Sequence, residues 1–195
     1  MIDVKKAATI GHCRAFSRSS FLAALFFAAC SQPDNYVYGG VNGHDAIPAA
    51  QLPNIRTALF GERETANGRE RIVVMSDTDH LCAKLDANPH FFSQPSVGLV
   101  ALILRTPAGR IGTFNVNADA GATLEVSGGP GSGSATYNAG SGLVYVGEAD
   151  AKTGSQASGN FSQVILLSTD GSGTAVGQMD GAFVADYCAP VAKLP

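Results

Sequence analysis

The sequence predicts a mainly β domain, either an antiparallel β-sandwich or a barrel-like sheet, with one short helix near residues 77–87. Short runs of β-branched and aromatic residues recur between glycine-rich turns, and the chain contains 23 Gly. Hydrophobic residues make up 45% of the 195 residues and charged residues only 15%. Because a disordered chain is poor in hydrophobic residues and rich in charge, this composition favours a chain with a packed core.

The first part of the domain has few clear strands. Residues 36–41 alternate weakly and predict an edge strand, and residues 43–53, with two prolines, predict a loop. The charged stretch 58–68 predicts a turn region. Residues 71–75, which read RIVVM, are the first compact β-type run.

Residues 77–85 are the best helix candidate. Ser76 or Asp77 would cap the first turn, because a short side-chain oxygen accepts hydrogen bonds from the free N–H groups there. Asn88 and the proline after it would end the helix. Its larger side chains recur at helical spacing, at Leu81, Cys82 and Leu85.

From residue 97 onward the chain predicts strands separated by turns. Residues 97–104 are apolar on both parities, as in a strand that is covered on both faces. Residues 110–116 would return after a turn at 107–109 and form a hairpin with this strand. Further strands are expected at residues 122–126, 142–148, 160–168 and 176–187, with loops at 128–134, 153–159 and 170–173.

The last predicted strand has the clearest alternation. The polar side chains of this strand share one parity and its largest apolar side chains share the other, so one face should be buried and the other exposed to solvent. Cys188 follows on the parity of the solvent-exposed face, so it could reach a neighbouring element only if the chain bends there. The apolar parity holds Met179, Phe183, Ala185 and Tyr187, and the polar one Gln178, Asp180 and Asp186.

The first 29 residues predict an export signal. Residues 1–20 carry four basic side chains against one acidic side chain, and residues 21–29 read FLAALFFAA without a charge. This apolar run is too short to span a bilayer, because a transmembrane helix needs about 20 residues.

The residues at the end of this run, Phe27-Ala28-Ala29-Cys30, resemble the lipobox of bacterial lipoproteins. That motif is an aliphatic residue and two small residues before the Cys that receives the lipid, and Phe27 departs from its usual Leu. The resemblance implies a signal peptide at 1–29, a lipidated Cys30 with a tether at 30–35, and a single β-rich domain at 36–195. Ser31 after the Cys implies sorting to the outer membrane. The alternative is an ordinary signal peptide with a chance Cys.

The charge of the processed chain excludes some partners. Four of the 13 basic and one of the 16 acidic residues lie in residues 1–29, so nine and fifteen remain, a net charge of −6. With no basic excess to neutralise phosphates, we expect no nucleic-acid partner. An acidic surface also does not favour anionic lipid head groups, so the lipid would hold the protein at the membrane.

The remaining cysteines predict a disulfide. Cys13 would be lost with the signal and Cys30 would be acylated, which leaves Cys82 and Cys188. Two cysteines in an exported domain most often pair. A metal site or a reactive thiol is the alternative, although the chain has no CxxC or HxxxH motif to support a metal site.

The second half is also similar to uncharacterised lipoproteins of Gram-negative bacteria. The shared features are a Ser-Asp plus Cys segment, strands of the Gly-x-Phe type and a final strand that ends in Cys. The resemblance implies no activity and covers about 115 residues. It rests on Ser76, Asp77, Cys82, the segments 112–114 and 181–183, and Cys188.

No motif predicts catalysis, and we expect no cofactor. Asp77, Asp79 and His80 are weak candidates for a divalent cation, but a capped helix start explains them better. Lone histidines such as His44, His80 and His90 usually lie on the surface or are hydrogen-bonded in a core. The aromatic residues are expected to pack the core rather than to line a ligand surface: Tyr36, Tyr38, Tyr137, Tyr145, Phe91 and Phe92.

These observations predict a membrane-anchored envelope lipoprotein that serves as a noncatalytic binding or structural module. Its partner would be an envelope protein or a small ligand of unknown identity. One alternative is a lipocalin-like carrier with a cavity for a small apolar molecule. A less favoured alternative is a hydrolase whose site is dispersed over loops and uses one of the three histidines named above.

Overall fold

The computed structural model describes residues 35–41, 55–93, 99–127, 134–147 and 149–195. These residues form a mainly β fold, as predicted. Its elements are β1 (Tyr36–Val41), β2 (Thr57–Thr65), β3 (Gly68–Ser76), α1 (Leu81–Ala87), the 3-10 helix η1 (Phe91–Ser93), β4 (Leu99–Pro107), β5 (Gly112–Asn115), β6 (Gly121–Ser127), β7 (Ser134–Val146), β8 (Gln156–Leu167), β9 (Ala175–Tyr187) and the 3-10 helix η2 (Ala189–Lys193).

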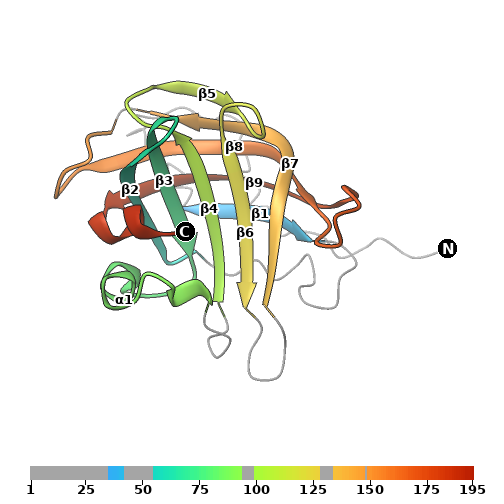
Figure 1. Ribbon diagram of the computed structural model, residues 1–195, viewed down its shortest axis with the longest axis horizontal. Helices are drawn as coiled ribbons and strands as arrows, with labels where there is room; N and C mark the ends of the chain where they lie inside the picture. The colour runs from blue at the N-terminus through green and yellow to red at the C-terminus, as the bar shows by residue number, and fades with distance from the viewer. Residues whose placement is uncertain (1–34, 42–54, 94–98, 128–133, 148) are drawn as a thin grey trace, which may run out of the picture. The chain divides into compact units, whose positions relative to one another are not determined.

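Seven strands pair into a closed ring, in the order β2-β3-β4-β6-β7-β8-β9 and back to β2 (Figure 1). All neighbours are antiparallel except β9 and β2, which pair in parallel at Leu59↔Asp186 and Phe60↔Tyr187. Strand β1 adds to β9 and strand β5 adds to β7. The ring corresponds to the barrel-like alternative rather than to the sandwich.

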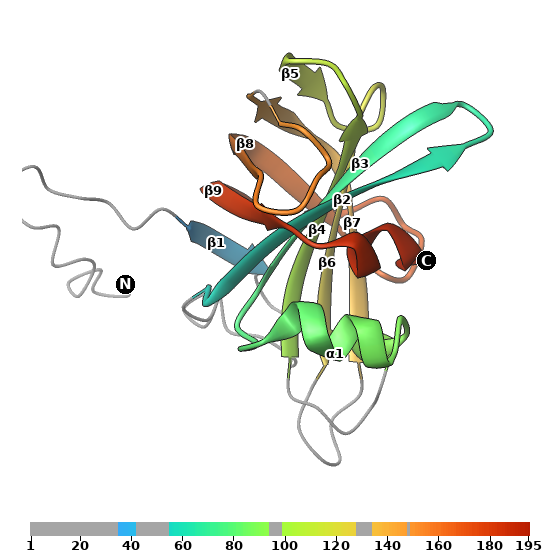
Figure 2. The same cartoon turned by 90° about the vertical axis from the view of Figure 1, so that its left-hand side faces the viewer.

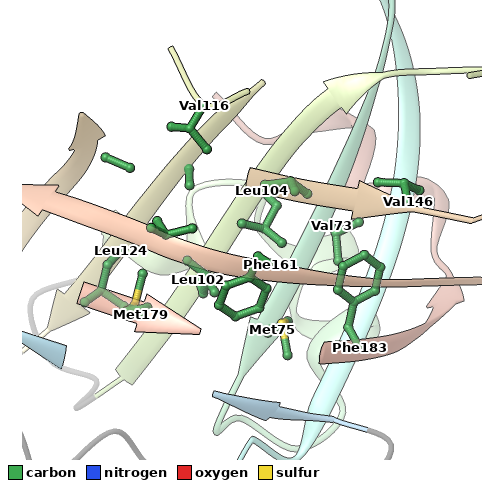
Figure 3. Close-up of a cluster of buried hydrophobic side chains, with 14 of the residues drawn as sticks. Val73, Met75, Leu102, Leu104, Val116, Leu124, Val146, Phe161, Met179 and Phe183 are labelled. Atoms are coloured by element: carbon green, nitrogen blue, oxygen red, sulfur yellow. The ribbon is translucent and has the colours of Figure 1, made fainter. Parts of the chain in front are cut away.

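One hydrophobic cluster fills the inside of the ring. Side chains that point inward alternate along each strand with side chains that point outward, as strand geometry requires. Fully burying one large apolar side chain stabilises a fold by about 1.5–3 kcal/mol, so this cluster is a major source of stability. Figure 3 shows several of its members: Val73, Met75, Leu102, Leu104, Leu124, Phe161, Met179 and Phe183.

A second cluster lies on the outer face of β2, β3 and β4. Ile72 and Val74 on β3, and Ile103 on β4, point away from the ring and pack under α1, η1 and η2. The strand at 97–104 was predicted to be covered on both faces, and its described residues 101–104 are buried on both parities. Figure 2 shows α1 and the C-terminal turn in front of this face.

The predicted disulfide closes this cover. Cys82 on α1 is bonded to Cys188, and their Cα atoms lie 5.9 Å apart. The chain bends where β9 ends, since the N–H of Cys188 donates to the carbonyl of Phe60 and η2 begins at the next residue. The last two residues are held in place as well. Arg63 donates to the carbonyl of Leu194, and Arg105 donates to Pro195 at 2.6 Å.

The prediction of a turn region at residues 58–68 was wrong, because most of this stretch is β2. Its charges fit a strand because they face opposite charges on β3 in register. Such pairs stabilise neighbouring strands. The paired residues are Glu62↔Arg71, Arg63↔Glu70 and Glu64↔Arg69.

The predicted helix starts later than expected. Strand β3 continues to Ser76, whose hydroxyl accepts from the N–H of Thr78 at 3.2 Å and closes a turn before the helix. Helix α1 begins at Leu81, and His80 is its N-cap in the left-handed conformation, without a side-chain cap bond. Neither Ser76 nor Asp77 is therefore the cap, whereas the end at Asn88 is as predicted. No helix among the described residues is long and apolar enough to cross a membrane.

The predicted hairpin between residues 97–104 and 110–116 was also wrong. Strand β4 is occupied by β3 on one side and by β6 on the other, so β5 pairs with the end of β7 instead. Strand β7 is longer than predicted, and β8 begins at Gln156, inside the loop expected at 153–159. The loop expected at 43–53 lies outside the described residues, and so does the loop expected at 128–134 except for Ser134, which begins β7.

Candidate functional site

The outward-facing side chains of β1, β5, β7, β8 and β9 form an exposed and almost uncharged face. The five strands contain no Lys, Arg, Glu or His, and their charged residues are Asp180 and Asp186. Three large hydrophobic side chains are exposed on them: Tyr38 by 58%, Leu143 by 40% and Tyr145 by 39%. The face therefore differs from the charged β2–β3 hairpin.

A groove of about 410 Å³ lies on this face. Its lining comes from β5, β7, β8 and β9, and it contains three amides, one hydroxyl and two aliphatic side chains. We call it the bulge groove, because both β7 and β8 depart from regular pairing beside it. The side chains that line it are Asn115, Ser141, Leu143, Gln163, Ile165 and Gln178.

Two irregularities in neighbouring strands shape the groove. The register between β7 and β8 shifts on either side of Ser141, and the register between β8 and β9 shifts between Phe161 and Val164. Gly142 has φ 141°, and a Cβ at this position would lie 2.7 Å from the Cα of Val164. Only glycine permits this close approach of two backbones. Bulges of this kind re-aim side chains and are common beside functional sites.

Asp180 on β9 holds the irregular part of β8. Gln163 has φ 51°, an unfavourable conformation for a residue other than glycine. The backbone N–H of Gln163 donates to Oδ1 of Asp180 at 2.8 Å. The side-chain amide of Gln178 donates to Oδ2 of the same carboxylate at 3.2 Å. One carboxylate thus fixes the backbone at Gln163 and orients the amide of Gln178.

The turn after β5 supports the other side of the groove. Asn117 has φ 68°, and its side-chain amide donates to the carbonyl of Gly140 at 2.8 Å. The N–H of Val116 donates to the carbonyl of Gly142 at 3.0 Å. Of the three described non-glycine residues with positive φ, two therefore lie at the groove or at its support. Strain of this kind persists only where surrounding contacts maintain it.

The groove offers neutral hydrogen-bonding groups. The side-chain amides of Asn115 and Gln163 make no hydrogen bond to a residue that the structure describes. Each amide can donate two hydrogen bonds and accept two. Leu143 and Ile165 add apolar surface between them. The arrangement suits an uncharged ligand that has many hydrogen-bonding groups.

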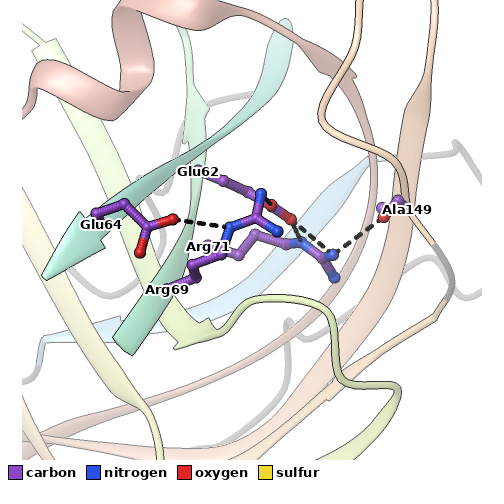
Figure 4. Close-up of polar contacts among 5 residues, drawn as sticks. All are labelled: Glu62, Glu64, Arg69, Arg71 and Ala149. Atoms are coloured by element: carbon purple, nitrogen blue, oxygen red, sulfur yellow. Dashed lines mark hydrogen bonds and ion pairs between the residues drawn. The ribbon is translucent and has the colours of Figure 1, made fainter. Parts of the chain in front are cut away.

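A buried ion-pair cluster lies at one end of the ring (Figure 4). Glu62 on β2 and Arg71 on β3 are inward-facing cross-strand neighbours, with side chains 5% and 2% exposed. Oε1 of Glu62 accepts from both Nε and Nη2 of Arg71, at 3.0 and 2.9 Å. The Nη2 group also donates to the carbonyl of Ala149 at 3.2 Å, and Arg69 binds the second oxygen of Glu62 at 2.9 Å.

Two polar atoms next to this cluster have no hydrogen-bond partner among the described residues. They are Nη1 of Arg71 and the hydroxyl oxygen of Thr106, and these two residues are cross-strand partners. A groove of about 350 Å³ borders Thr106. Its lining includes two basic and two acidic residues, Arg69, Arg105, Glu70 and Asp119. The charge of this groove therefore favours neither an anion nor a cation.

The weak metal candidates are not brought together around a common point. Asp79 pairs with Arg56 at 3.0 Å, and both side chains are about 60% exposed. His80 is exposed at the start of α1. In the described part of the chain, no group of three or more His, Cys, Asp or Glu side chains is placed to hold a metal ion. His90 is exposed as well, whereas His44 and Cys30 lie outside the described residues.

The prediction that the aromatic residues pack the core holds for three of the six. Tyr137, Phe91 and Phe92 are buried, but Tyr38 and Tyr145 are exposed and Tyr36 is half-buried beside Tyr38. The bulge groove was not predicted, because its residues are spread over 64 positions and meet only through pairing. The glycines at 140 and 142 were the one local signal, since glycine inside a strand often marks a bulge.

Comparison with known proteins finds no family model, no curated protein and no solved structure that matches this chain. The chemistry of the groove itself is therefore the guide to its role.

Proposed function

We propose that this protein is an exported, lipid-anchored binding module of the bacterial cell envelope that acts without catalysis. The resemblance of residues 27–30 to a lipobox supports an anchor at Cys30, and Ser31 supports the outer membrane as its location. The Cys82–Cys188 disulfide supports export, because such bonds persist in oxidising compartments and are rare in the cytosol.

The observation that carries the binding role is the bulge groove. Two strands leave regular pairing at the same place, and Asp180 maintains the unfavourable backbone of Gln163 there. A purely structural sheet has no need of such strain, which is typically found where side chains are positioned for a ligand. Binding through the exposed face therefore accounts for the groove better than a scaffold role.

The carrier alternative requires space inside the ring. The inward-facing positions instead hold large side chains that pack against one another, among them Phe60, Leu102 and Phe161, each no more than 2% exposed. A ring filled in this way resembles small closed sheets whose interior is a packed core rather than a ligand cavity. This packing favours recognition on the outside of the ring.

The test of this proposal is the intact mass of the protein purified from its native membranes, with and without reductant. The expected mass is that of an acylated chain from Cys30 to Pro195 that gains two hydrogens on reduction. A Cys30→Ser variant should appear in the periplasmic fraction instead of the membrane fraction. An unlipidated native chain with two free thiols would overturn both the anchor and the export.

A further inference from the structure

We propose that the bulge groove binds a neutral carbohydrate chain, an inference that rests on the binding role proposed above. The groove combines two amide side chains, those of Asn115 and Gln163, that form no hydrogen bond to any residue the structure describes, with an adjacent exposed tyrosine and no cationic side chain in its lining. Each of these features selects among the classes of ligand that an envelope protein can meet.

Charge excludes ionic ligands first. The strands around the groove contain no Lys or Arg, so a phosphate or carboxylate ligand would find no opposite charge there. The carboxylate of Asp180 contacts the groove wall, but both of its oxygens accept hydrogen bonds from groups of that wall. It is therefore part of the support rather than a ligand for a cation.

The polar lining excludes a purely apolar ligand. Covering Asn115, Gln163 and Ser141 with hydrocarbon would remove their water without replacing its hydrogen bonds, and an unsatisfied polar group costs about 1–3 kcal/mol. A ligand must therefore bring its own donors and acceptors. A sugar hydroxyl does both at once, and two neighbouring hydroxyls match the donor and acceptor of one planar amide.

The apolar parts of the site match the apolar faces of a sugar ring. A pyranose ring presents C–H groups on its faces and hydroxyls along its edge. Tyr145 lies two residues from Leu143 on the same face of β7, and this residue is 39% exposed. Its cross-strand neighbours on β5 and β8 are Thr113 and Asn160, so the same chemistry continues beyond the groove. This continuity favours a chain of several sugar units over a single one.

A polypeptide partner is the competing occupant. Protein interfaces usually centre on buried aromatic or arginine anchors that fill a pocket in the partner. The bulge groove has Leu143 and Ile165 as its only apolar side chains, and amides surround them. The lining thus resembles a polar recognition site more closely than an apolar protein-binding pocket.

The test uses the lipidated protein in a detergent without a sugar head group. An array of neutral and sialylated oligosaccharides is probed first, and soluble maltotriose and triacetylchitotriose are then titrated by NMR. We expect binding to at least one neutral glycan, with a loss of affinity of about tenfold or more in a Gln163→Gly, Gln178→Ala double variant. The glycine at 163 keeps the left-handed backbone, so this variant removes side chains without disturbing the bulge.

The matched control is Gln156→Ala. Gln156 also lies exposed on β8, and its amide also donates to an aspartate of β9, Asp186, at 2.8 Å. This variant should bind the glycan as the unmodified protein does. Tyr145→Ala should weaken binding, and Tyr145→Phe should restore it, because stacking needs the ring and not the hydroxyl.

Three outcomes would overturn the carbohydrate proposal. They are binding of sialylated glycans alone, equal effects of the groove variant and the Gln156→Ala control, or no glycan bound at all. A purified envelope protein that binds in a Gln178-dependent way would assign the groove to a polypeptide. That result would leave the proposed binding role intact. The intact-mass measurement tests the lipid anchor and the export, so its failure would not decide what the groove binds.

Discussion

The phenyl group of Phe161 on β8 lies over Gly181 on β9, in the space that a side chain at position 181 would occupy. The two residues are cross-strand partners. Two positions away the arrangement is exchanged, because the glycine, Gly159, is on β8 and its partner Phe183 is on β9. A Cβ on Gly181 would lie 2.8 Å from Cε1 of Phe161, and one on Gly159 would lie 2.5 Å from Cζ of Phe183. Each phenylalanine fills the space beside the glycine that faces it, so the segments 159–161 and 181–183, both of which read Gly-x-Phe, interlock.

This relationship predicts that Gly181→Ala destabilises the fold. The added methyl group would force the Phe161 ring and the backbone of Tyr36 to move, and such overpacking costs about 1–3 kcal/mol. The measurement is the free energy of unfolding in urea. The control is Gly121→Ala, whose Cβ would meet only the Cβ of Arg105 at 3.7 Å and should leave stability unchanged or raised. Equal stability of both variants would disprove the interlock.

The elements that were predicted from sequence are those with a local pattern. The alternation along β9 places Met179 inside and Gln178 outside, as its period of two predicts. Strand β2 was missed because a charged run resembles a turn until its partners on β3 are known. The contact between β2 and β9 that closes the ring involves residues such as Leu59 and Asp186, which are far apart in the chain. No periodicity encodes such a pairing, and the bulge groove depends on pairings of the same kind.

The buried ion pair predicts a large effect of removing one partner. Glu62→Gln would leave the charge of Arg71 buried without a carboxylate, which typically costs about 3–5 kcal/mol. The double variant Glu62→Leu, Arg71→Met should lie close to the unmodified protein, because it removes both charges and keeps the volume. Urea unfolding of the single and double variants gives the coupling energy.

An exposed pair in the same protein serves as the control. Asp79→Asn breaks the contact with Arg56, and both side chains there are about 60% exposed. Surface pairs of this kind contribute about 1 kcal/mol or less. If Glu62→Gln costs no more than Asp79→Asn, the charge of Arg71 is not left buried and uncompensated when its carboxylate is removed.

The disulfide predicts a strong dependence of stability on redox state. It joins residues that are 106 positions apart, and closing a loop of this length stabilises a fold by about 4–5 kcal/mol in the chain-entropy model. The double variant Cys82→Ala, Cys188→Ala should lose this amount in guanidinium unfolding. Reduction of the unmodified protein should lower its stability by a similar amount. A loss below about 1 kcal/mol in both experiments would show that α1 and η2 hold the cover without the bond.

Glu125 on β6 predicts a dependence of stability on pH. Its side chain borders a small crevice with Phe92 and Leu194. Burial raises the pKa of this carboxyl, and the charge of Arg105 opposes the rise only in part. A raised pKa in the folded state means that the protonated form folds more favourably than the ionised form. The stability that the protonated Glu125 contributes is thus complete below the unfolded pKa of about 4.3, and it is lost as the pH rises through the folded pKa.

The variant Glu125→Gln, which cannot ionise, should gain stability relative to the unmodified protein between pH 3.5 and pH 7. Urea unfolding at both pH values measures the difference, and a difference that stays constant would show that Glu125 is solvated in the folded state.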